Sequence, residues 1–309
     1  MKNGKKCPVC NTIDSTRIDS YNNYAIYSCR NCSLIFCDPF KNPGSVFYEK
    51  FYEKLDLHNV DRFNINEAQQ YFIKRNTPGK LIDIACGTGR FIHHAKKYNF
   101  NVYGLDFDSV ALNVCKQKYR LKNVYNIPLS SPKLFKFGRF DYVTLIDVLE
   151  HVDNPLSLIQ SCNKILKKDG LLVISVPNYT RKPDYIFKQG DSPPHHLTKW
   201  TTESLNYLVK NQGFKVVYCK PLRFTNHDTY MWIKTMTYDK IFNHGYRRKK
   251  ISKRNGNAII KSTRSSLYKY KIRDILVSIF EIGLTPITFI GVHLIKFESD
   301  HIYLEARKL

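Results

Sequence analysis

The stretch Leu81-Ile-Asp-Ile-Ala-Cys-Gly-Thr-Gly-Arg90 decides the fold of this chain. An apolar run around one acid, Asp83, leads into a tight turn at Gly87 and Gly89, and a helical pattern starts at Phe91. An apolar run before a glycine-rich turn is typical of a buried parallel strand that feeds a helix. Glycines let a ligand approach the backbone, and the free N–H groups at the helix start favour a carboxylate or phosphate. The stretch therefore predicts a strand–turn–helix unit that binds a ligand.

A second acid marks the end of the next apolar run. Asp106 lies 17 residues past Gly89. An acid about 20 residues after such a turn is placed to accept hydrogen bonds from ribose hydroxyls. The alternative is a plain strand–turn–helix of any α/β domain. The third glycine of dinucleotide-binding turns is absent, whereas Asp83 and Asp106 both stand where a nucleoside-bearing ligand would need them.

Three motifs then follow in order: Asp83-Ile-Ala-Cys-Gly-Thr-Gly89, Gly104-Leu-Asp106 and the run from Phe140 to His151. Together they resemble the class I S-adenosylmethionine-dependent methyltransferases, over roughly residues 76–222 and the last ten residues. The resemblance implies an enzyme with an α/β, Rossmann-like fold. Its seven-stranded sheet would have six parallel strands, an antiparallel last strand, and helices on both faces.

The resemblance also assigns cofactor contacts, with Asp83 near the methionine end of S-adenosylmethionine and Asp106 on its ribose. The full set that it implies for the cofactor is Asp83, Ala85, Gly87, Gly89, Asp106, Phe107 and Asp147. The family often has an acid near the end of the third strand, facing the adenine amine, but the run from Tyr125 to Leu129 has none. Adenine recognition is then left to backbone groups or to Asn126.

Three histidines fall on predicted loops at the ligand edge of the sheet. His151 closely follows a clear strand over Phe140–Ile146, and open α/β sheets bind ligands at the carboxyl ends of their strands. The loop from Ser192 to Trp200 carries His195 and His196 and resembles a loop of sugar and small-metabolite methyltransferases. The sugar C-methyltransferases have a Glu-His pair there, so His in place of Glu favours O-methylation. A hydroxyl acceptor needs a general base, and a neutral imidazole suits that task at pH 7. The catalytic candidates are, in order, His196, His195 and His151.

Four cysteines near the N-terminus have the spacing of a metal site. Cys7-Pro-Val-Cys10 and Cys29-Arg-Asn-Cys32 are separated by eighteen residues that suit a short β-hairpin. Four thiolates satisfy a tetrahedral, structural zinc and leave no open position for chemistry. The predicted zinc ligands are Cys7, Cys10, Cys29 and Cys32. The alternative is a pair of redox dithiols, but no thioredoxin-like unit surrounds them. Nine cysteines in such a chain indicate thiols or metal ligands in a reducing cytosol.

The length and charge of the chain limit its domain organisation and its partners. The chain has 309 residues, 43% of them hydrophobic, with a net charge of +23 that favours anionic partners without choosing among them. Residues 153–168 are predicted to form a helix that ends at Asp169-Gly170. The predicted regions are a zinc ribbon (1–45), a helical linker or lid (46–75), the methyltransferase core (76–222), a basic and apolar helical insertion (223–297) and the final strand (298–309).

The insertion contains 21 residues, Ile275–Ile295, with a single charge. That length could span a bilayer, but one crossing would leave the last strand on the wrong side. We expect a buried or interfacial helical hairpin beside a basic face. The alternative is a solvated basic surface over an ordinary pair of core helices.

These observations predict methyl transfer to a small molecule, a sugar or lipid-linked acceptor in surface polysaccharide or related synthesis. The enzyme would be cytoplasmic, with peripheral contact to the anionic inner face of the membrane. One alternative is an RNA base methyltransferase that uses the zinc ribbon and the basic insertion, although nucleic acid is the less favoured partner because no amino-methylation motif follows the fourth strand. The other is a zinc-ribbon adaptor without catalysis.

Overall fold

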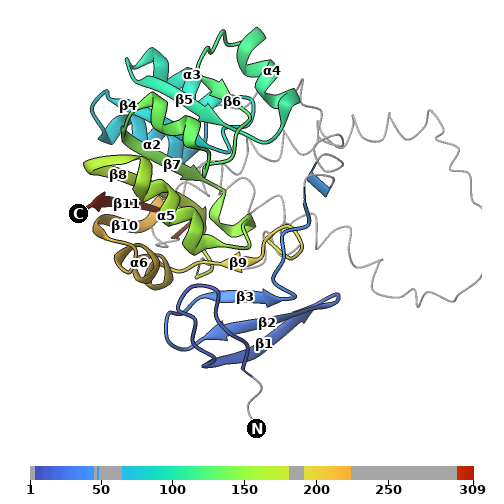
Figure 1. Ribbon diagram of the computed structural model, residues 1–309. Helices are drawn as coiled ribbons and strands as arrows, with labels where there is room; N and C mark the ends of the chain where they lie inside the picture. Colours follow the sequence, from blue (N-terminus) through green and yellow to red (C-terminus); the bar gives the residue numbers. More distant parts are fainter. Residues whose placement is uncertain (1–3, 45–46, 49–64, 181–190, 224–297) are drawn as a thin grey trace, which may run out of the picture. The chain divides into compact units, whose positions relative to one another are not determined.

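The computed structural model describes residues 4–44, 47–48, 65–180, 191–223 and 298–309 (Figure 1). Residues 1–222 and 300–309 belong to one compact unit. The predicted helical hairpin over 275–295, the basic run before it and residues 46 and 49–64 of the predicted linker or lid lie outside the described residues. Among the residues that are described, no helix has the length and apolar character to cross a membrane.

A seven-stranded mixed sheet forms the centre of the unit and confirms the predicted fold class. Its strands lie in the order β10-β11-β8-β7-β4-β5-β6 (Figure 1). The bounds are β4 Lys80–Ile84, β5 Asn101–Leu105, β6 Val124–Tyr125, β7 Phe140–Ile146, β8 Leu166–Pro177, β10 Phe214–Arg223 and β11 Glu298–Lys308. Strands β5, β4, β7 and β8 run parallel, and β11 is antiparallel to β8. The central strands are almost entirely buried, which explains their continuous apolar runs.

Helices pack on both faces of this sheet. Their bounds are α2 Glu67–Arg75, α3 Arg90–Lys97, α4 Ser109–Gln117, α5 Pro155–Ile165 and α6 Thr202–Lys210, with short 3₁₀ turns at Pro132–Phe137 and Leu149–His151. Buried residues of α2, α3 and α4 form one core cluster with the sheet, and those of α5 and α6 form another. The Asp108 carboxylate accepts hydrogen bonds from two backbone N–H groups of α4, as its N-cap position predicts.

The helix predicted to reach Lys168 ends earlier, so that prediction was wrong by three residues. Helix α5 stops at Ile165, where Leu166 adopts an extended backbone and pairs with Phe140 of β7. Leu166 is buried, and burying its side chain between strands outweighs the helical pattern that continues to Lys168.

The N-terminal region forms a second, four-stranded sheet that includes a strand from the core. Its order is β1-β2-β3-β9, with β1 Ser15–Tyr21, β2 Tyr24–Cys29, β3 Ile35–Asp38 and β9 Thr198–Lys199 (Figure 1). Strands β1 and β2 form an antiparallel hairpin, which confirms the short β-hairpin predicted between the two cysteine pairs. Strand β9 comes from the loop that carries the predicted histidines and pairs antiparallel with β3. The N-terminal region is thus hydrogen-bonded to that loop.

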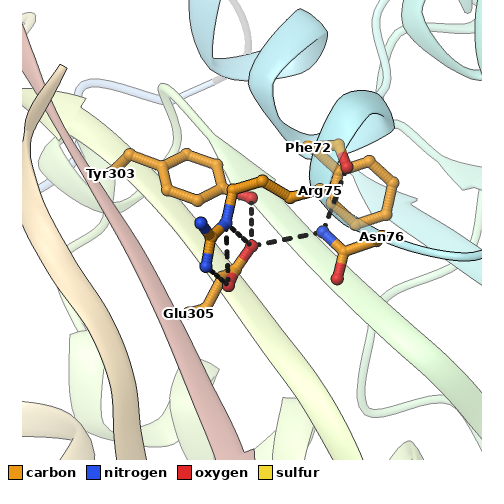
Figure 2. Close-up of polar contacts among 5 residues, drawn as sticks. All are labelled: Phe72, Arg75, Asn76, Tyr303 and Glu305. Atoms are coloured by element: carbon orange, nitrogen blue, oxygen red, sulfur yellow. Dashed lines mark hydrogen bonds and ion pairs between the residues drawn. The ribbon is translucent and has the colours of Figure 1, made fainter. Parts of the chain in front are cut away.

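A buried ion pair holds the end of α2 to the last strand (Figure 2). The Arg75 guanidinium donates to both oxygens of Glu305, with Nη2–Oε2 at 3.1 Å and Nε–Oε1 at 3.2 Å. Asn76 Nδ2 and the Tyr303 hydroxyl also donate to Oε1, at 3.2 and 2.9 Å. Every one of these donors is directed at a single carboxylate, so α2 is fixed against β11 at its C-terminal end.

Candidate functional site

The two acids that the sequence singled out lie at the glycine-rich turn after β4, and one of them, Asp106, is hydrogen-bonded to it. Asp83 is buried, and its Oδ1 accepts a hydrogen bond of 2.6 Å from Thr144. Burial raises the pKa of Asp83 to about 7. Asp106 accepts from the backbone N–H groups of Gly87, at 2.7 Å, and Asp108, at 2.8 Å. A carboxylate has about four acceptor positions, so Asp106 retains capacity for ribose hydroxyls.

The two glycines of the turn serve different purposes. Gly87 has a φ of +54°, and a Cβ built there would meet nothing within 4 Å. Its outer face is therefore open to a ligand. Gly89 has a φ of +77°, but a Cβ there would lie 2.7 Å from Cys115 Sγ and 2.8 Å from a Leu121 methyl. Packing behind the turn, as well as its conformation, therefore requires glycine at position 89. Ala85 precedes the turn and also has a positive φ, of 58°.

Phe107 lies exposed at the rim of this site, next to Asp106. Asn126 Nδ2 donates a 2.7 Å hydrogen bond to the Phe107 backbone carbonyl. The amide nitrogen that the sequence offered for adenine recognition is thus already engaged, and it positions the Phe107 backbone. The Asn126 side chain therefore holds the backbone of the loop that carries the Phe107 ring.

Asp147 joins three distant parts of the chain at the carboxyl end of β7. Its Oδ2 accepts from Asn66 Nδ2, at 3.3 Å, and its Oδ1 lies 3.1 Å from His301 Nε2. Asn66 is the N-cap of α2 and forms a capping box with Gln69. The capped start of α2 therefore borders the predicted cofactor edge, while its other end is held by Glu305.

The structure brings the three predicted histidines together. The ring centroids of His151 and His195 lie 4.5 Å apart, those of His151 and His196 4.7 Å, and those of His195 and His196 4.8 Å. His151 Nδ1 lies 2.8 Å from the His195 carbonyl oxygen. Because a carbonyl only accepts, that nitrogen carries the proton, and the lone pair of a neutral imidazole is then on Nε2, which lies 3.8 Å from Glu150 Oε1. Burial lowers the pKa of His151 and lowers that of His195 to about 4, so both imidazoles are neutral at pH 7.

A carboxylate that the sequence analysis missed accompanies His196. Asp191 Oδ1 lies 3.6 Å from His196 Nδ1, and both side chains are largely buried. A carboxylate on one imidazole nitrogen favours the proton there and leaves the other nitrogen to act as a base. Asp191 opens the run Asp-Ser-Pro-Pro-His-His. An acid four residues before a histidine pair was the available signal.

A tyrosine of the predicted lid was also missed. The Tyr48 ring is buried, and its centroid lies 6.1 Å from Phe107, 6.0 Å from His151 and 5.9 Å from His195. Tyr48 therefore stands between the rim of the cofactor site and the histidines. The lid role of residues 46–75 stays a prediction.

The four N-terminal cysteines converge on one centre. Cys7 Sγ lies 3.6 Å from Cys32 Sγ, and Cys10 Sγ lies 3.4 Å from Cys29 Sγ. All four sulfurs lie within 4.8 Å of one another. None of the nine cysteines forms a disulfide. A tetrahedral zinc with bonds of about 2.3 Å holds its sulfurs about 3.8 Å apart, so this donor set fits such an ion.

Comparison with known proteins identifies the class. Residues 57–218 match the family model described as "Methyltransferase domain". Together with the sheet order, the glycine turn and the two acids, this match shows that the chain belongs to the methyltransferase domain family and is a class I S-adenosylmethionine-dependent methyltransferase, as the motifs predict.

Curated relatives carry a more specific name. The chain is 32% identical over 161 residues to a "Ubiquinone biosynthesis O-methyltransferase" of Glaesserella parasuis, which covers 45% of this chain and 68% of that protein. It is 30% identical over 185 residues to a protein of the same name from Actinobacillus pleuropneumoniae serotype 7, which covers 51% of this chain and 79% of that protein. A solved S-adenosylmethionine-dependent methyltransferase from Archaeoglobus fulgidus aligns over 85% of this chain and 100% of its own, with a TM-score of 0.50 at 17% identity, and supports the fold alone.

Proposed function

We propose that the protein transfers the methyl group of S-adenosylmethionine to a hydroxyl oxygen of a small-molecule acceptor, with His196 as general base. The observation that carries the proposal is the Asp191–His196 pair, at 3.6 Å, within a cluster of three histidines at the ligand edge of the sheet. The names of the curated relatives support O-methylation. They lend no support to RNA base methylation or to a non-catalytic adaptor.

The reaction needs alignment and one proton acceptor. Bound S-adenosylmethionine supplies an electrophilic methyl group on a positive sulfur. The acceptor oxygen forms a bond to the methyl carbon while the carbon–sulfur bond breaks, and the electron pair of that bond stays on sulfur. The hydroxyl proton passes to the imidazole nitrogen of His196 that does not face Asp191. Because the sulfur becomes neutral, the protein has to hold the groups in line more than to stabilise charge.

Two acceptor classes follow from separate observations. A sugar or lipid-linked sugar suits the histidine loop, by its resemblance to sugar methyltransferases. A phenolic hydroxyl of a quinone precursor is the second candidate, because the relatives are named for ubiquinone biosynthesis.

We also propose that the four N-terminal thiolates hold a structural zinc ion. The sulfur separations of 3.4 and 3.6 Å support it, as does the small apolar content available to a region of this size. Purified protein should contain one zinc per chain by elemental analysis. Cys29→Ser should contain less than about a fifth of that, while Cys219→Ser, on β10, should keep it.

The decisive experiment is label transfer. Purified protein is incubated with methyl-labelled S-adenosylmethionine and an extract of its source cell, and nucleic acid, organic-soluble lipid and small polar metabolites are then separated. Label in polar or lipid-linked sugars supports the first acceptor class, and label in an organic-soluble phenol supports the second. Label in RNA would overturn the proposal. His196→Ala and Asp106→Ala proteins serve as controls for the base and for the cofactor site.

A further inference from the structure

His196 borders a hollow of about 370 Å³ whose walls come from two parts of the chain. One wall is the N-terminal hairpin, through Ile18, Asp19 and Tyr21 of β1 and residues of β2 and β3. The other wall comes from described residues of the core after β8, among them Tyr179 and Asp191. The hairpin therefore faces the same space as the proposed base.

The lining combines exposed apolar surface with carboxylates. Ile18, Tyr21 and Tyr179 are 48%, 36% and 40% exposed, and all three border the hollow, so their apolar surface is available to a ligand there. Asp19 and Asp191 supply two carboxylates, and among the described residues that border the hollow Lys199 is the one lysine or arginine. These described lining residues carry a formal charge of about −1 with histidine neutral, in a chain with a net charge of +23.

The combination of tyrosine rings and carboxylates in the lining favours some classes of ligand over others. A phosphate or another strong anion is disfavoured beside two carboxylates. A neutral polyhydroxylated ring fits, because its C–H faces can pack on tyrosine rings while its hydroxyls donate to the carboxylates. A flat phenol would also pack on the tyrosines, but its single hydroxyl could donate to only one of the two carboxylates.

We propose that the β1–β2 hairpin forms one wall of the acceptor site and that the hollow holds a neutral pyranose-type ring next to His196. The inference rests on the proposed O-methyl transfer and names its acceptor class. Asp19 and Tyr21 are specificity-determining residues that touch the acceptor and do not touch the cofactor.

The cysteine cluster lies at the open end of the β1–β2 hairpin. Cys29 is the last residue of β2 and pairs with Ser15, the first residue of β1, so the cluster anchors the open end of the hairpin. Loss of the metal should release the wall and weaken acceptor binding. The glycine turn and Asp106 lie in the core sheet, so cofactor binding should persist.

The test uses the full-length protein with bound S-adenosylhomocysteine and four probes, the methyl glycosides of glucose, galactose, mannose and rhamnose. Saturation-transfer-difference NMR measures binding of each glycoside, and calorimetry measures S-adenosylhomocysteine binding. Asp19→Asn keeps the shape of the side chain, and Tyr21→Ala removes the ring. Asp169→Asn and Tyr98→Ala are matched controls, because both are exposed and lie outside the hollow.

At least one glycoside should bind the wild-type protein, about tenfold more weakly to Asp19→Asn and Tyr21→Ala, and equally well to both controls. Chelation of the metal should abolish glycoside binding and leave the affinity for S-adenosylhomocysteine within about twofold. No binding of any glycoside, or equal binding to all variants, would overturn the inference. Methyl transfer to a phenol at an unchanged rate in Tyr21→Ala would overturn it while leaving O-methylation intact. Glycoside binding without transfer to any hydroxyl would instead overturn the proposed function alone.

Discussion

Two glutamates of the core are almost completely buried, and their surroundings differ. Glu305 is 3% exposed and Glu150 is 1% exposed. Glu305 accepts hydrogen bonds from Arg75, Asn76 and Tyr303 (Figure 2). Among the described residues, Glu150 Oε2 has no hydrogen-bond partner, and Oε1 lies 3.8 Å from His151 Nε2.

This difference indicates that Glu305 stabilises the fold, whereas Glu150 belongs to the candidate site. A buried carboxylate with an arginine and two further donors is stable as an anion. Burial raises the pKa of Glu150 well above its ordinary value, and the neighbouring Asp147 raises it further. Buried acids with strongly shifted pKa values gather at functional sites. Glu150, whose Oε2 lacks a hydrogen-bond partner among the described residues, lies at the carboxyl edge of the sheet, where ligands bind.

The largest effect should come from the histidine at that edge. His196→Ala should lower the rate of methyl transfer by about 10² or more, because a general base contributes about 10²–10⁴-fold. The dissociation constant for S-adenosylmethionine should stay within about twofold, since the substitution leaves the glycine turn and Asp106 unchanged. Single-turnover kinetics and calorimetry measure the two quantities.

His94→Ala is the matched control for that experiment. His94 lies on α3, where its ring is tilted against Tyr98 and away from the cluster of three histidines. An unchanged rate for His196→Ala would remove His196 from the mechanism, and a weaker cofactor affinity in it would assign the residue to binding.

The next effect concerns the buried ion pair. Arg75→Ala should lower the free energy of unfolding by about 3 kcal/mol, because it leaves the Glu305 carboxylate buried without its cation. The value lies at the low end for a buried pair because the Arg75 side chain is 35% exposed. Urea denaturation measures it, with Lys74→Ala on the same helix as control. A loss below about 0.5 kcal/mol would show that Asn76 and Tyr303 suffice to hold the carboxylate.

Much of the fold could be predicted because its signals are local. Strand β7 matches the predicted Phe140–Ile146 to the residue, since a continuous apolar run ends abruptly at Asp147. The glycine turn and the cysteine pairs are likewise short motifs in which spacing alone carries the information. The early end of α5 was missed because Leu166 is held by a strand pairing that the helical pattern does not reveal.

The missed parts of the site depend on contacts between distant segments. Arg75 and Glu305 are 230 positions apart, and neither residue stands in a motif. Strand β9 pairs Thr198 with Phe36 of the N-terminal sheet, although the sequence suggested only an isolated hairpin there. Tertiary packing decides these two contacts, and no local sequence pattern indicates them. Asp191 differs, because it lies only five residues before His196 and its spacing was an available signal.

A smaller effect should appear in the pH dependence of stability. His195 has a pKa of about 4 in the folded protein, against an ordinary value of 6.5, because burial disfavours its charged form. Between these two values the unfolded chain binds more protons at this position, so His195 makes the free energy of unfolding decrease as the pH falls from 6.5 towards 4. His195→Gln should therefore show a shallower loss of melting temperature over that window. An equal or steeper loss would contradict a neutral, buried imidazole.

The smallest effect is expected for Glu150→Gln, and replacing each glutamate by its amide is the sharpest test of the comparison. Glu150→Gln should change the free energy of unfolding at pH 7 by less than about 0.5 kcal/mol, because the amide imitates the protonated carboxyl that burial favours. Glu305→Gln should cost about 2 kcal/mol, since it removes the charge that Arg75 faces. Urea denaturation of the two variants side by side gives the difference directly. If Glu150→Gln proves as costly as Glu305→Gln, then Glu150 is ionised in the folded protein. The balancing positive charge would then come from a protonated His151 or from His301, and a protonated His151 would no longer belong to the neutral cluster that the proposed chemistry requires.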